Sequence, residues 1–85
     1  MLSETIKSRI RTFASLGSCQ LYDSISLSGI SWTCRARIQW VDTYYRCLRT
    51  QTEHVFSTTR ADKFDLMFSE AKQYLEEIKK QKHEV

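Results

Sequence analysis

The strongest pattern in the chain is a mostly apolar stripe that returns every three or four positions through its middle third. Its members are Cys34, Ile38, Val41, Tyr45, Leu48, Thr52 and Val55. Polar residues repeat with the same spacing on the other side: Arg35, Gln39, Asp42, Arg46, Arg49 and Glu53. A helix at about 100° per residue produces this two-sided segregation. No glycine or proline follows Gly29, so the pattern predicts a helix over 31–56.

The two ends of the chain show the same periodicity. The apolar residues of the first segment are Leu2, Ile6, Ile10 and Phe13, and those of the last are Phe64, Met67, Phe68, Ala71, Leu75 and Ile78. The first set predicts a helix over 3–16, with Ser3 as its N-cap and Gly17 in the left-handed conformation at its end. The second predicts a helix over 60–81, which Thr59 and Asp62 start in a capping-box-like arrangement.

Residues 18–29 fit either a short helix or a strand, because their apolar residues also alternate with polar ones. In the strand interpretation Ser28-Gly29 is a hairpin turn, and the alternation continues through Trp32, Cys34, Ala36, Ile38 and Trp40. The alternation stops after Trp40, and Asp42-Thr43 is a poor hairpin turn. The helical pattern continues to Phe56 and is therefore preferred.

These elements predict an all-α fold over residues 1–85: a small antiparallel bundle of three main helices and a short fourth element. The alternative is an α+β fold with the order helix, three strands, helix. A chain of 85 residues forms one domain with a thin margin of stability, which oligomerisation can supplement.

The composition argues against catalysis. There are two glycines, two histidines and three cysteines without a CxxC spacing, so phosphate loops, catalytic triads and zinc sites have no support. We expect no enzyme activity, cofactor or metal. The odd number of cysteines predicts buried, reduced thiols, and no apolar run reaches the ~20 residues of a membrane span. A cytoplasmic protein is expected.

The segment Gly29-Ile30-Ser31 resembles the turn of helix-turn-helix proteins, followed by Thr33 and a basic stretch. The resemblance implies a recognition helix that contacts DNA through arginines. The register departs from that motif, because Arg35 falls at the position that should pack into the core.

The leading functional hypothesis is a small regulatory binding protein, of the adaptor or inhibitor type that phages and mobile elements often encode. It would occupy a protein surface with an aromatic and arginine face of the third helix, formed by Arg35, Trp40, Tyr44, Arg46 and Arg49. A homodimer or a hetero-complex would cover this wide apolar face. The alternative is nucleic-acid binding by the cationic stripe of this +3 chain: Arg9, Arg11, Arg35, Arg37, Arg46 and Arg49.

Overall fold

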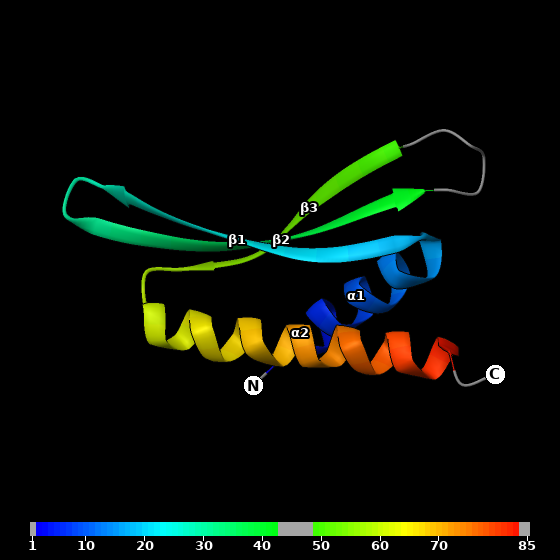
Figure 1. Cartoon of the computed structure of the whole chain (residues 1–85). Helices are drawn as coiled ribbons and strands as arrows, with labels where there is room; N and C mark the ends of the chain where they lie inside the picture. The colour runs from blue at the N-terminus through cyan, green and yellow to red at the C-terminus, as the bar shows by residue number, and fades with distance from the viewer. Residues whose placement is uncertain (1, 43–48, 84–85) are drawn as a thin grey trace.

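The described part of the chain forms two helices that flank three strands in the sequence (Figure 1). The computed structural model describes residues 2–42 and 49–83. Its elements are α1 (Glu4–Leu16), β1 (Ser18–Ser28), β2 (Ser31–Asp42), β3 (Arg49–Thr58) and α2 (Ala61–His83). The strands form one antiparallel sheet in the order β1-β2-β3, so β1 and β3 are its edges.

This α+β fold contradicts the predicted all-α bundle and matches the alternative of a helix, three strands and a helix. Residues predicted as one helix over 31–56 form β2 and most of β3, and no helical third segment exists among the described residues. Cys34 and Ile38 are four positions apart, a spacing that puts two residues on one face of a helix or a strand alike. Ala36 and Trp40 are buried together with Cys34 and Ile38. Burial of every second residue identifies a strand.

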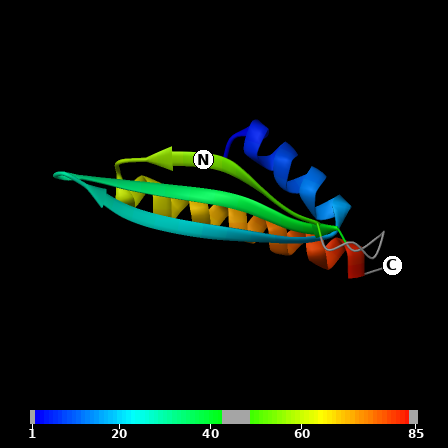
Figure 2. The same ribbon diagram turned by 90° about the horizontal axis from the view of Figure 1, so that it is seen from above.

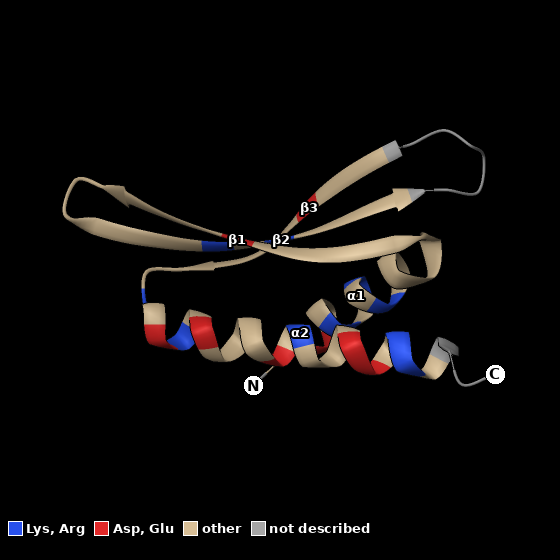
Figure 3. Ribbon diagram, viewed as in Figure 1, with Lys and Arg blue, Asp and Glu red and all other residues tan. Residues whose placement is uncertain are grey.

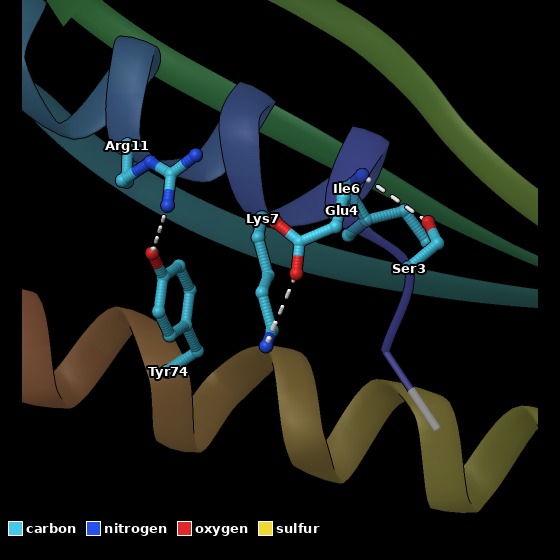
Figure 4. A network of polar contacts seen from close by, with 6 residues as sticks. All are labelled: Ser3, Glu4, Ile6, Lys7, Arg11 and Tyr74. Carbon is cyan, nitrogen blue, oxygen red and sulfur yellow. Dashed lines mark hydrogen bonds and ion pairs between the residues drawn. The ribbon is translucent and has the colours of Figure 1, made fainter.

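Both predicted terminal helices are confirmed. The Ser3 Oγ caps α1 by accepting a hydrogen bond of 3.3 Å from the Ile6 N–H (Figure 4). The conformation predicted for Gly17 is wrong, because its φ of 161° is extended backbone. At the start of α2 the predicted role of Thr59 is also wrong. The helix begins at Ala61, and the Arg60 carbonyl accepts its first helical hydrogen bond, 3.0 Å from the Phe64 nitrogen, so Arg60 occupies the N-cap position.

The core lies between the sheet and the two helices, which cover the same face of it (Figures 1 and 2). The larger cluster contains Ile6, Ile10 and Ala14 of α1, Ala71 and Leu75 of α2, and Cys19 and Ile38 of the sheet. The smaller cluster packs Phe64 and Phe68 of α2 against Cys34 and Ala36. The α2 helix therefore contributes to both clusters, whereas α1 contributes buried residues only to the larger one.

Polar contacts hold α1 against its neighbours. Arg11 donates a hydrogen bond of 3.1 Å to the Tyr74 hydroxyl of α2, and the Lys7 ammonium lies 5.9 Å from the centre of the same ring (Figure 4). Arg9 forms an ion pair of 3.1 Å with Glu53 of β3. Two arginines of the predicted cationic stripe thus make contacts within the fold.

The hairpin of β1 and β2 has a two-residue turn, Gly29-Ile30, between the paired residues Ser28 and Ser31. Gly29 has a φ of 62°, a value that suits the tight turns of hairpins and favours glycine. This turn replaces the predicted helix-turn-helix geometry, because β2 follows it in place of a recognition helix. Pairing of β1 with β2 continues without a shift to Ser18 opposite Val41.

Candidate interaction surfaces

The outer half of the β1–β2 hairpin projects past the start of α2 (Figures 1 and 2). Leu27 lies directly opposite Trp32, and Ile25 opposite the buried Cys34, so all four side chains share the face that the helices cover further along the sheet. Beyond the helices this face is uncovered: Ile25 and Leu27 are each 54% exposed and Trp32 is 52% exposed. Ile30 at the turn is 100% exposed.

We call Ile25, Leu27, Ile30 and Trp32 the hairpin patch. Among the described residues, the other exposed large hydrophobic side chains are Leu16, Tyr22 and Leu66, which lie on three different elements. Single exposed apolar side chains are ordinary, whereas a group of them in one place marks an interaction surface. The alternation of Ile25 and Leu27 was visible in the sequence. Their exposure was not, because it depends on where the helices end in space.

The free edge of β1 borders the patch and faces a groove. The groove has a volume of about 280 Å³ and lies between Gln20, Leu21 and Tyr22 of β1 and Lys72, Leu75, Glu76 and Lys79 of α2. Leu21 and Leu75 give it an apolar part, and the charged ends of α2 side chains border it. This combination suits an aliphatic side chain that enters beside polar groups.

The opposite face of the sheet is open and cationic. Arg35 and Arg37 are exposed and alternate with the buried residues of β2, so they point away from the helices. Tyr22, Arg37 and His54 form one row across the three strands. No acidic residue faces this side among the strand side chains that the structure describes, and most acidic residues in Figure 3 lie on the helices. An extended anion would meet no carboxylate on this face.

The residues predicted for a protein interface are not brought together. Trp40 is only 7% exposed and contacts Phe13, with the ring centroids 5.9 Å apart. Arg35 lies on the opposite, open face of the same strand. Arg49 begins β3 opposite Asp42, whereas Tyr44 and Arg46 fall outside the described ranges. The aromatic and arginine face of a third helix therefore does not exist as predicted, because a strand sends Arg35 and Trp40 to opposite sides.

The predicted nucleic-acid set is divided in a similar way. Arg9 and Arg11 lie on α1 and contact Glu53 and Tyr74. Arg35 and Arg37 share the open face, where neither forms an ion pair with a described residue. Of the four arginines in this set whose side chains the structure describes, only Arg35 and Arg37 present guanidinium groups without an ion pair side by side.

Two of the three cysteines are buried and unpaired, as predicted: Cys19 is 1% and Cys34 is 0% exposed. Cys47 lies outside the described residues. Burial raises the pKa of the Cys19 thiol, and the charge of Lys79 partly opposes this effect. Within 2–42 and 49–83, no group of three histidine, cysteine or acidic side chains could hold a metal ion.

Comparison with protein-family models, curated proteins and solved structures gives no match. Neither α1 nor α2, the helices of the described ranges, is long and apolar enough to cross a membrane. The functional interpretation therefore depends on the hairpin patch and on the open face of the sheet.

Proposed function

We propose that this is a small non-enzymatic binding protein that acts by covering a protein surface with its hairpin patch. The observation that carries the proposal is the group of four large apolar side chains that no helix covers, each more than half exposed. The proposed setting is the cytoplasm, where buried thiols such as Cys19 and Cys34 stay reduced.

Burial of the patch contributes part of the free energy of a specific contact. Complete burial of one large aliphatic or aromatic side chain contributes about 1.5–3 kcal/mol. Three of the four side chains are already half covered, so the patch can add a few kcal/mol before the cost of association. Trp32 is the expected anchor, because tryptophan is enriched among the residues that dominate binding energy. This surface replaces the one predicted around Trp40.

A comparison of two double variants tests the proposal. Leu27→Thr with Trp32→Thr removes the centre of the patch, and Leu16→Thr with Leu66→Thr removes two exposed leucines elsewhere. Each tagged protein is used to isolate partners from the native cells, with and without nuclease. We expect proteins recovered with the wild type and the control to be missing with the patch variant. Identical recovery by all three proteins would refute the proposal.

The open face supports a second candidate function, binding of single-stranded nucleic acid. The specific observation is that Arg35 and Arg37 are unpaired on a face where the described side chains include no acid, with Tyr22 beside Arg37. Arginine forks bind phosphates, and an exposed aromatic ring can stack on a base. An open sheet face gives access to splayed bases.

Binding of a labelled random oligonucleotide, measured by fluorescence anisotropy against salt, tests this second function. Each phosphate contact on a single strand contributes about −0.7 to the slope of log affinity against log salt. We expect Arg35→Gln with Arg37→Gln to make that slope shallower by about 1.4, whereas Lys63→Gln with Lys80→Gln, which removes equal charge from α2, leaves it unchanged. Equal slopes for both variants would exclude the open face.

A further inference from the structure

The free edge of β1 lacks most of the features that usually stop a sheet from adding another strand, and only Asp23, a charged residue on the helix-covered face, is of that kind. All residues of β1 pair with β2 in one continuous register, whereas the pairing of β2 with β3 contains a shift between Ala36 and Arg37. The β1 sequence contains no proline, lysine or arginine, and its one charged residue is Asp23. Regular edges without such protection present unpaired backbone groups to other strands. A further strand can therefore pair with β1.

The outer part of β1 is complementary to itself. Two β1 strands can pair antiparallel with the Ser26 residues of the two copies opposite each other. Ile25 of each copy then lies opposite Leu27 of the other. Asp23 then lies opposite Gly29, so the like charges of two Asp23 residues are kept apart. Pairing about Asp23 itself would place these charges directly opposite each other, which is destabilising. The register about Ser26 thus covers apolar residues with apolar residues.

A second feature gives the same register. Ile30 is fully exposed at the turn, and the groove beside Tyr22 and Leu21 is open at the edge of β1. Ile30 and Tyr22 are equally far from Ser26 along the chain. Pairing about Ser26 therefore brings the turn of each copy level with the groove of the other. In a two-fold interface of this type the same contact between turn and groove forms twice, because each copy contributes both parts.

We propose that the partner of the hairpin patch is a second copy of this chain, joined by antiparallel pairing of the two β1 strands about Ser26. This inference rests on the proposed function, because it names the partner of the same patch. The product is one continuous six-stranded sheet with all helices on one face. On that face Trp32 and Leu27 of one copy continue into Ile25 and Cys34 of the other. The open faces with Arg35 and Arg37 form one surface on the other side.

The first test is the mass of the purified full chain in solution, by light scattering at micromolar concentration. We expect a value near twice 10.1 kDa. Leu27→Lys places a charge in the interface and should return the mass to that of one chain. Leu66→Lys, the same change at an exposed position of α2, should leave the dimer intact. Circular dichroism of both variants verifies that they are folded.

Cysteines introduced one at a time into β1 then measure the register, in a chain whose Cys47 is replaced by serine and whose Cys19 and Cys34 remain buried. Two residues directly opposite on antiparallel strands have Cα atoms about 4.5–5.5 Å apart, which is within the range of a disulfide. Ser26→Cys should therefore cross-link to itself upon mild oxidation. Ser24→Cys should not, because its two copies would be roughly 14 Å apart along the strand. Ser28→Cys alone should also fail, but a mixture of the Ser24→Cys and Ser28→Cys proteins should cross-link.

A mass of one chain, a dimer that survives Leu27→Lys, or self-cross-linking of Ser24→Cys in place of Ser26→Cys would each overturn the inference. A monomer whose other protein partners are lost with the Leu27→Thr and Trp32→Thr variant would refute the dimer and leave the proposed function standing. A dimer of the expected register supports both, because the same patch then binds a protein.

Discussion

The rings of Phe13 and Trp40 meet edge to face, with centroids 5.9 Å apart and planes inclined by 68°. This contact joins the last turns of α1 to the middle strand, and it accounts for the burial of Trp40. Aromatic pairs in this geometry contribute about 0.5–1.5 kcal/mol beyond the area that they bury. Trp40 therefore belongs to the core, in contrast to Trp32 at the outer end of the same strand.

Trp40→Ala is expected to lower the free energy of unfolding by about 3–5 kcal/mol, because it leaves a cavity beside Phe13. Trp40→Phe should cost much less, since it keeps a ring and removes an indole N–H that has no described partner. Urea titrations followed by far-UV circular dichroism measure both values. Trp32→Ala is the matched control, and a loss equal to that of Trp40→Ala would contradict the difference in burial.

The ion pair between Arg9 and Glu53 should couple α1 to β3 only weakly. Its atoms are 3.1 Å apart, but the two side chains are 39% and 34% exposed, so water screens the attraction. A double-mutant cycle with Arg9→Met and Glu53→Gln is expected to give a coupling of about 0.2–1 kcal/mol at low salt. This value should fall as salt is added. A larger, salt-independent coupling would show that the pair is shielded from water.

Cys19 should make the stability depend on pH in the alkaline range. Burial raises its pKa in the folded state, so the folded chain keeps a proton that the unfolded chain loses above its ordinary pKa of about 8.5. This contribution is complete below that pKa and decreases as the pH rises through the interval up to the folded pKa. The free energy of unfolding of the wild type minus that of Cys19→Ala should therefore decline above about pH 8.5. A difference that is constant with pH would contradict this assignment.

Substitutions of Gly29 test whether the hairpin turn requires a positive φ at this position. Its φ of 62° is unfavourable for residues with a side chain, although a Cβ there would have no heavy atom within 4 Å. The cost of Gly29→Ala is therefore purely conformational, about 1–2 kcal/mol. Asparagine tolerates this conformation better, so Gly29→Asn should cost less. The midpoints of urea unfolding report both changes, and equal costs would argue against a backbone origin.

The sequence alone predicted the two terminal helices and failed in the middle of the chain. The apolar residues of α1 and of α2 lie on one side of each helix, towards the shared core, so their period of 3.6 is unambiguous. In β2 the spacing of Cys34 and Ile38 fits the period of a helix as well as that of a strand. The apolar positions from Val41 to Val55 extend the helical pattern, although β2 and β3 are strands. Residues 43–48 contain no glycine or asparagine, so the strand interpretation lacks the local sequence signal of a hairpin turn after Asp42.

The candidate surfaces were even less accessible to sequence reasoning. Arg35 and Arg37 belong to the predicted cationic stripe and lie together on the open face, but the grouping of that stripe rests on a helical wheel, which does not apply to a strand. Ile25 and Leu27 alternated as a half-buried strand should. Nothing in that alternation shows whether a helix covers the strand, because coverage depends on contacts between residues distant in the chain.

Because β1 pairs with β2 without interruption, side chains alternate between the two faces of the sheet in the same order from the tip of the hairpin to the core. Sliding β1 by one residue would turn Ser24 and Ser26 to the side where Ile25 and Leu27 now lie, and the same movement would bring Gln20 into the core in place of Leu21. The tip residues therefore cannot change faces unless the core residues of the same strand change faces as well. The register therefore specifies the exposed residues of the patch as strictly as the buried residues of the core.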